Sequence, residues 1–396
     1  MNEKKILYIS GSVGLGHITR DLAIAGELRR QYPGVKIAWL AASPADQLLK
    51  DAGENLLPEA SESVGATAIA EDLAQGDSLN LITYTLKALK ELPWNAAILD
   101  RVLSKERFDV IIGDETYELL QPFNKVSRLK KYPFVMIDDF IGVDAMTDHW
   151  LEKLAVYWLN FLWLKVCKDY LDLLLFDGEL EDIPDKRFGF LLPKRRAWAK
   201  KRCKFIGYVL PFDPSQYTDK FLIRKKLGYG SEPLVLCSIG GKAIGRELLE
   251  LCGRAYTVLK ERIPDIRMVL VCGPRLSADS LDLPSGVEVR GYVPNLYEHF
   301  AACDLAIVQG SGTTTLELTA LRRPFIYSPI RGHFEQEKHV AYRLSRHRAG
   351  IKVSLSEMTP SSLAEMVIAN LGKAVTYPPI PVDGAKRLAQ LIGQYL

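Results

Sequence analysis

The chain has 396 residues, of which 48% are hydrophobic and 25% charged, and its formal net charge is +3. This composition excludes a disordered protein, and this length favours two domains of about 200 residues each. The small net charge does not indicate nucleic acid as the main partner. No apolar run reaches the roughly 18 residues of a membrane-spanning helix, and the N-terminal residues MNEKKILYIS lack the layout of a signal peptide.

The cysteines are dispersed along the chain, without a CxxC pair and without a nearby histidine that would complete a metal site. Most of them lie in apolar surroundings. We therefore expect buried thiols and a reducing, cytoplasmic location, with the inner face of a membrane as a further option. The cysteines are Cys167, Cys203, Cys237, Cys252, Cys272 and Cys303.

The first half of the chain has the alternating pattern of a parallel α/β domain. A strand at residues 4–10 leads through a glycine turn into apolar residues at helical spacing, and a second strand at residues 35–41 completes a βαβ unit. Two prolines within residues 207–214 indicate a connector between domains. Further strands of this half are expected at residues 110–113, 134–137, 171–176 and 205–207.

The same pattern restarts in the second half. The chain is therefore predicted to be an α/β protein with two doubly wound, Rossmann-like domains that face each other across a cleft. The predicted domains are residues 1–207 and 208–372, and a last helix within residues 373–396 is expected to pack back on the first domain. The expected strands are 234–239, 267–272, 287–290, 305–309 and 325–328, and the expected helices 247–261, 296–302, 313–321, 335–346 and 383–395.

A loop of small residues stands between a strand and a helix in the second half, and it is the strongest local signal for a ligand. Backbone N–H groups at a helix N-terminus, with the helix dipole behind them, can receive a diphosphate. Glu317 follows about one turn later, where a carboxylate can accept both hydroxyls of a ribose. The alternative is an ordinary helix cap with Glu317 as its capping-box acid. The loop residues are Gly310, Ser311, Gly312, Thr313 and Thr314.

Two further loops follow strands of the same predicted sheet and open at the same edge. One carries His333, Glu335 and Gln336, whose side chains suit the hydroxyls of a sugar. The other, Gly240 and Gly241, supplies backbone donors. The alternative interpretation is that Glu335 is a favourable acid in the first turn of a helix and that Gln336 is a solvated surface residue. Convergence of three loops favours a ligand site.

The order of these motifs resembles the donor-binding domain of MurG-like glycosyltransferases, a family-28-like group related to monogalactosyldiacylglycerol synthase. The resemblance covers most of residues 232–350. It implies the GT-B fold and inverting transfer from a UDP-sugar, used as co-substrate without a metal or other cofactor. It rests on LVLCSIGG at 234–241, VRGYVP at 289–294, DLAIVQGSGT at 304–313, and on Glu317, Pro324, Pro329, Glu335 and Gln336.

The same resemblance implies a role for each part of the donor site. Glu317 would hold the ribose, the loop from Gly310 to Thr314 the diphosphate, and Glu335 with Gln336 the sugar. Tyr292 and Val293 would lie beside the base. The stretch at residues 331–334 departs from the shorter pattern of many relatives, which leaves the pairing of His333, Glu335 and Gln336 with sugar atoms open.

The glycine turn of the first half, GSVGLGH at residues 11–17, is a poor dinucleotide fingerprint because its spacing is G-x-x-G-x-G and no acid closes the second strand. A dehydrogenase is therefore disfavoured. In MurG-like enzymes such a loop contacts the acceptor, which assigns Gly14, Gly16 and His17 to acceptor binding. Histidine suits proton abstraction from a hydroxyl near neutral pH, so His17 is the candidate general base. The alternative is a structural residue at a helix start.

Carboxylates at the ends of two other strands of the first half are expected near His17. Asp114 is the first choice to orient His17 or to act as the base itself, and Asp138 or Asp139 are alternatives. Two other functions of the same fold stay open: a sugar-nucleotide 2-epimerase, and a non-catalytic subunit that binds a nucleotide sugar.

One segment rich in Trp and Leu runs from Trp150 to Leu164, and a densely basic one runs from Lys194 to Arg202. Apolar aromatics beside cations suit docking on an anionic membrane surface. The alternative is a core helix next to a solvated loop.

Overall fold

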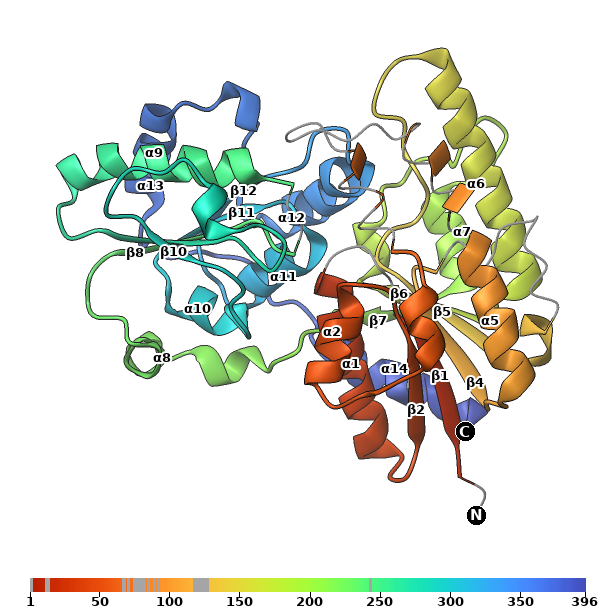
Figure 1. The fold of residues 1–396 in the computed structure, drawn as a ribbon. Coiled ribbons are helices and arrows are strands. Elements are labelled where there is room, and N and C mark those ends of the chain that lie inside the picture. Colours follow the sequence, from red (N-terminus) through yellow and green to blue (C-terminus); the bar gives the residue numbers. More distant parts are fainter. Residues whose placement is uncertain are drawn as a thin grey trace. The chain divides into compact units, whose positions relative to one another are not determined.

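The computed structural model describes residues 3–10, 15–65, 69, 72–73, 83, 86–87, 90–91, 93–116, 128–241 and 244–396. The chain forms two compact units (Figure 1). The first extends to Phe212 and also includes Pro381–Leu396, and the second is Asp213–Ile380. Both are built on parallel sheets, so the predicted fold class of two doubly wound α/β domains is confirmed.

The sheet of the first unit has the strand order β3-β2-β1-β4-β5-β6-β7, with every described pair parallel. The order reverses between β1 and β4, and ligands of such sheets bind at this switch point, beyond the carboxyl ends of the strands. The strands are β1 Lys5–Ile9, β2 Lys36–Leu40, β3 Asn55–Leu56, β4 Val110–Asp114, β5 Phe134–Asp138, β6 Leu173–Asp177 and β7 Cys203–Gly207.

Helices cover both faces of this sheet because successive strand side chains point to opposite sides. Leu7 and Ile9 of β1 face a core completed by α5, α6 and α7, whereas Ile6 and Tyr8 face α1, α2 and α14. Shorter 3-10 helices lie at Pro58–Glu62, Leu129–Lys131 and Leu180–Asp182. The α-helices are α1 Leu15–Gln31, α2 Ala45–Asp51, α5 Pro93–Lys105, α6 Trp150–Tyr170, α7 Arg195–Arg202 and α14 Gly384–Ile392.

Helix α14 belongs to the first unit although it ends the chain, and Figure 1 shows it in blue beside α1. It packs on α1 and β7, and Leu388, Ala389 and Ile392 are fully buried in the core. At its start Gly384 lies so close to the backbone of Tyr208 that a Cβ would stand 2.7 Å from the carbonyl. The C-terminal segment is therefore part of the first unit's core.

The second unit repeats the design with the strand order β10-β9-β8-β11-β12-β13, and its switch point lies between β8 and β11. One face of its sheet packs on α9 and α13. The strands are β8 Leu234–Ser238, β9 Arg267–Val271, β10 Glu288–Arg290, β11 Leu305–Gln309, β12 Phe325–Ser328 and β13 Ile351–Lys352. The α-helices are α8 Lys220–Leu227, α9 Arg246–Arg262, α10 Leu296–Ala302, α11 Gly312–Ala320, α12 Ala341–His347 and α13 Pro360–Asn370.

Several details differ from the sequence-based expectation: β3, α8 and β13 were not anticipated, and the first unit extends to Phe212 where residue 207 was expected. The helix expected at residues 335–346 begins as a π-helix, Glu335–Val340, before α12, and α13 was not anticipated. All six cysteines are free and buried, as expected. In the part of the chain that the structure describes, no helix combines the length and the apolar character needed to cross a bilayer.

Candidate active site

His17 and Asp114 meet at the switch point of the first unit. His17 lies in the first turn of α1, directly after β1, and Asp114 ends the neighbouring strand β4. The Nδ1 atom of His17 is 3.1 Å from Oδ2 of Asp114, whose side chain is fully buried. If Nδ1 carries the proton and its N–H donates a hydrogen bond to Asp114, Nε2 keeps a free lone pair and can accept a proton from a substrate.

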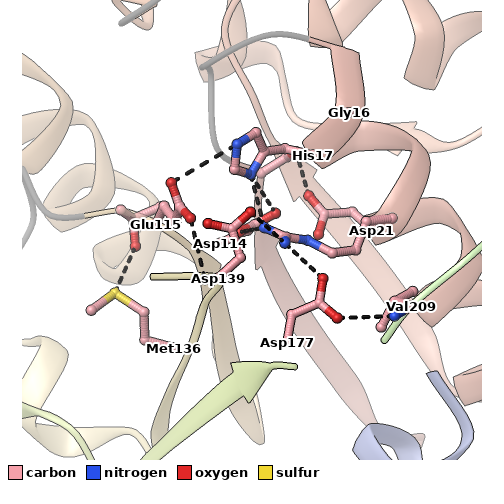
Figure 2. A network of polar contacts seen from close by, with 12 residues as sticks. Gly16, His17, Asp21, Asp114, Glu115, Met136, Asp139, Asp177 and Val209 are labelled. Atoms are coloured by element: carbon pink, nitrogen blue, oxygen red, sulfur yellow. Dashed lines mark hydrogen bonds and ion pairs between the residues drawn. The ribbon is translucent and has the colours of Figure 1, made fainter. Parts of the chain in front are cut away.

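Arg20 forms ion pairs with Asp114 and Asp177, the last residues of β4 and β6, and with Asp139, which follows β5. Figure 2 labels these three acids. The Nη2 atom of Arg20 donates to Asp114 at 2.5 Å, and its Nη1 donates to Asp177 at 2.9 Å and to Asp139 at 3.4 Å. The Nη2 atom also lies 2.9 Å from Nδ1 of His17. Both Arg20 and Asp114 therefore reach the same imidazole nitrogen.

The electrostatics of this cluster follow from burial and from one guanidinium among several acids. Burial opposes the charged form of Asp114, but the attraction of Arg20 and His17 outweighs it and holds the pKa of Asp114 well below its ordinary value. Burial raises the pKa of Asp177, although Arg20 opposes that shift. Burial also raises the pKa of Asp21 well above the ordinary value, assisted by the charge of Asp114. Asp114 is thus an ionised partner for His17.

Glu115 stands on the other side of the His17 ring, with its Oε2 3.9 Å from Nε2. Its backbone has φ of 50°, a left-handed conformation that non-glycine residues seldom adopt and that gathers at functional sites. Within the described residues, His17, Asp114 and Glu115 offer ligand atoms that lie within 4.8 Å of one another. Arg20 donates to Oδ1 of Asp114, so one of these carboxylate oxygens already has a cationic partner.

The sequence-based expectation that Asp114 lies near His17 agrees with the structure, but most of the cluster was not anticipated. Gly16 opens α1 beside His17, whereas Gly14 lies outside the described residues. Asp138 is buried at the end of β5, and Asp139 contacts Arg20. Arg20, Glu115 and Asp177 were missed. Two of these residues had a signal in the sequence: Arg20 follows His17 by three residues on one helix, and Asp177 is another acid at a strand end.

In the second unit the loop from Gly310 to Thr314 lies where β11 passes into α11. Ser311 is the N-cap residue, but its side chain makes no cap bond. The first N–H groups of a helix have no intrahelical partner. They are therefore open to an external acceptor, and the helix dipole favours an anion there. Gly310 is needed at this place because an added Cβ would stand 3.0 Å from Cα of Pro329.

Glu317 is buried in α11, and no hydrogen bond or ion pair reaches its carboxylate from the described residues. Burial raises the pKa of Glu317 to about 8. In a capping box the acid stands at the third helical residue, which here is Thr314. The ordinary-cap interpretation of Glu317 is therefore wrong. A buried carboxylate that no described residue contacts by a hydrogen bond, in a helix whose start has no side-chain cap, can instead receive hydroxyl donors of a ligand.

Two other predicted donor loops follow β8 and β10 of this sheet. Gly240 and Gly241 follow β8, and Gly240 has φ of 76°. The carbonyl of Ile244, three residues after Gly241 in the sequence, accepts from Nε2 of Gln309 at 2.9 Å. Exposed Tyr292 and half-buried Val293 follow β10, the edge strand. The loops after β8, β10 and β11 thus open at one edge, as parallel strands require.

The segment after β12 is stabilised by a hydrogen bond between two of its own residues. Buried Gln336 accepts from the backbone N–H of Ile330 at 2.9 Å, so its side-chain oxygen fixes this loop. His333 and Glu335 are half-buried at the start of the π-helix. A residue that sequence reasoning missed, buried Arg343 of α12, donates to the carbonyl of Gly312 at 2.8 Å. This bond ties α12 to the first residue of α11.

Comparisons with known proteins agree with the resemblance expected from the sequence. Residues 235–375 match the glycosyltransferase family 28 C-terminal domain. An uncharacterised glycosyltransferase of Methanopyrus kandleri is 28% identical over 192 residues, which are 48% of this chain. The match spans 53% of that relative, about half of its length.

Two further similarities extend over the whole chain. The UDP-N-acetylglucosamine–N-acetylmuramyl-(pentapeptide) pyrophosphoryl-undecaprenol N-acetylglucosamine transferase of Methylibium petroleiphilum is 22% identical, over 92% of this chain and 89% of its own. The crystal structure of Acinetobacter baumannii MurG superimposes with a TM-score of 0.56 at 16% identity, over 99% of each chain. The MurG-like resemblance and the GT-B fold are thereby confirmed.

Proposed function

We propose that this chain, a MurG-like protein whose second unit holds a glycosyltransferase family 28 C-terminal domain, transfers a sugar from a nucleotide-diphosphate donor to a hydroxyl acceptor. Two neighbouring features of the family-matched segment carry this proposal: the N-terminus of α11 has no side-chain cap, and the buried carboxyl of Glu317 has no hydrogen-bond partner among the described residues. A diphosphate next to a ribose presents the anion and the hydroxyl donors that these groups lack.

The second unit would hold the donor. The N–H groups at the start of α11 bind the diphosphate and stabilise its charge as it leaves. Glu317 accepts from the ribose hydroxyls, and the residues after β10 and β12 contact the base and the sugar. A UDP-sugar is the donor that the resemblance favours, and the proposed reaction uses no metal.

The first unit would activate the acceptor. Nε2 of His17 takes the proton of the acceptor hydroxyl as its oxygen attacks the anomeric carbon, while the bond from that carbon to the diphosphate breaks. Direct attack inverts the anomeric configuration. Ionised Asp114 accepts from Nδ1–H and stabilises the imidazolium that forms, and Arg20 keeps Asp114 ionised.

We further propose that the acceptor is lipid-borne. The name of the Methylibium petroleiphilum relative describes a pyrophosphoryl-undecaprenol acceptor. The Trp- and Leu-rich helix α6 of the present chain supports an acceptor at a membrane surface.

The test separates donor binding from catalysis. Thermal shifts with UDP-, GDP- and TDP-sugars identify the donor, since a ligand at 100 times its dissociation constant adds about 2.7 kcal/mol of stability. With that donor, we expect Glu317→Ala to abolish the shift. His17→Ala keeps the shift and lowers turnover on a lipid acceptor pool by roughly 10²–10⁴-fold.

Three outcomes would contradict the proposal: no shift with any nucleotide sugar, unchanged turnover in His17→Ala, or an epimer formed from the donor alone. The last would assign the chain to the sugar-nucleotide 2-epimerases.

Asp114→Asn is the matched variant of His17→Ala, because it leaves the imidazole in place and removes the charge that orients it.

A further inference from the structure

A cavity of about 910 Å³ lies beside α8 in the second unit (Figure 1). Among its lining residues, Pro233 directly precedes β8 and Asp304 directly precedes β11, so the cavity stands at the amino ends of these strands. The loops proposed to hold the donor follow the carboxyl ends of the same strands. A strand of five residues spans roughly 16 Å. A ligand of this cavity is therefore not the donor.

Asp304 joins the walls of the cavity. Its carboxylate accepts from Arg224 of α8 at 2.6 Å and from the backbone N–H of Leu234 at 2.8 Å, and it forms an ion pair with Lys220. Its carbonyl accepts from the backbone N–H of Gly372, which follows α13, at 3.1 Å. Segments that are distant in the sequence are thus fixed around one hollow, so its shape is set before any ligand binds.

The border of the cavity is apolar. Phe221 lines it and is 75% exposed, and the next residue of α8, Leu222, is 59% exposed. Half-buried Pro233 and Leu371 continue the apolar surface into the cavity. Large apolar side chains that stay exposed beside a preformed hollow are typical of a surface that another molecule covers.

The charge around the cavity is positive. Helix α8 has four bases and no acid among its eight residues. Exposed Lys225 lines the cavity, and exposed Lys373 lies next to the lining in the chain; neither forms an ion pair with a described residue. Among the described lining residues the only acid is Asp304, whose charge Lys220 and Arg224 already neutralise. The surface therefore favours a negatively charged partner.

We propose that this cavity docks an acidic segment of a partner protein, which inserts an apolar side chain beside Phe221 while its carboxylates pair with Lys225 and Lys373. An apolar anchor in a pocket with charges at its border is the usual anatomy of a protein interface, and opposite charge selects the partner. A flat bilayer would not fill a concave cavity, and a second copy of the same face would bring like charges together.

This inference goes beyond the proposed function and does not depend on it, because the cavity and the donor loops lie at opposite ends of the strands.

The test selects binding peptides by their chemistry. A displayed library of random peptides is selected in parallel on the wild-type protein and on a cavity variant, Phe221→Ser with Lys225→Glu. The enriched peptides are then synthesised, and fluorescence polarisation measures their affinity. The matched control in the first unit is Phe190→Ser with Lys194→Glu, since Phe190 is 80% exposed and Lys194 is exposed too. All the replaced side chains are exposed, so both variants should keep the unfolding midpoint of the wild type.

We expect the wild-type protein to enrich acidic peptides with a large apolar residue. These peptides should bind the cavity variant on the order of tenfold or more weakly, keep their affinity for the control variant, and bind less tightly as salt is added. Failure to enrich peptides, enrichment of peptides without acids, or equal affinity for the cavity variant would overturn the proposal.

Two further results would assign the cavity to another occupant and so contradict the proposal. One is a dimer that the cavity variant alone dissociates, because a second copy would then fill the cavity. The other is binding to phosphatidylglycerol vesicles that only the cavity variant loses. The donor-induced thermal shift is unaffected by either variant, so failure of this docking is distinguishable from failure of the transferase proposal.

Discussion

The carboxyl group of Glu317 is buried and has no hydrogen-bond partner among the described residues. Its protonation should therefore change near neutral pH. Burial raises its pKa to about 8, so the carboxyl is mostly protonated at pH 7 in the free protein. Ribose hydroxyls donate best to an ionised carboxylate. Donor binding should therefore favour loss of the proton.

We expect the affinity for the donor to rise as the pH increases from 6 towards 8 and to level off above the pKa of Glu317. Titration calorimetry with a UDP-sugar in buffers of different ionisation enthalpy would detect the released proton. Glu317→Gln cannot ionise, so its affinity should stay flat across the same range. A pH-dependent affinity in that variant would assign the effect to another group.

Arg20 shows how one buried cation organises several acids. Burial by itself lowers the pKa of Arg20, but the carboxylates around it, above all Asp114 and Asp177, raise that pKa well above its ordinary value. The guanidinium is therefore permanently charged. Its place next to Nδ1 of His17 makes it the residue that fixes Asp114 for the histidine.

At the scale of elements, the donor site depends on how closely two loops approach. The loop after β11 and the loop after β12 meet at Gly310, where an added Cβ would stand 3.0 Å from Cα and 3.3 Å from N of Pro329. These two atoms belong to the backbone, so they cannot move aside as a flexible side chain would. The α11 N-terminus keeps its position because residue 310 has no side chain.

We expect Gly310→Ala to weaken donor binding about tenfold or more, because the loop must shift away from the diphosphate. The variant should still fold, and isothermal titration with the donor measures the loss. Gly26→Ala in α1 is the matched control, since a Cβ there meets nothing within 4 Å and alanine favours a helix. Unchanged affinity in Gly310→Ala would remove this loop from the site.

At the scale of the molecule, the chain leaves its first unit after Phe212 and returns to it at Pro381. Three residues of α14 that complete the core on one sheet face come from the very end of the chain. The stability of the first unit therefore depends on a segment distant in sequence.

We expect Leu388→Ala with Ile392→Ala to lower the free energy of unfolding of the first unit by at least about 3 kcal/mol, because each truncation leaves a cavity. All six tryptophans, from Trp39 to Trp198, lie before Phe212. Urea denaturation followed by tryptophan fluorescence thus reports on the first unit alone. Exposed Gln390→Ala is the control on the same helix. Equal midpoints for both variants would show that α14 adds nothing to this core.

The amino-acid sequence by itself determined the fold class and most of the strands, because apolar periodicity, glycine turns and prolines act over a few neighbouring residues. Strands such as Leu305–Gln309 and Phe325–Ser328 begin and end as expected. The rule that functional groups follow parallel strands also predicted that His17 and Asp114 lie close together, since the carboxyl ends of parallel strands share one edge of the sheet.

Only the tertiary structure decided what each side chain meets. The contacts of Arg20 with Asp114 and Asp177 join residues 94 and 157 positions apart, and no local pattern encodes such a distance. Likewise, the sequence could not show that Glu317 has no partner among the described residues or that Arg195 of a basic run points inward to Asp144. Burial and pairing depend on surfaces that meet only when distant segments pack, and these two properties decide the chemistry of the site.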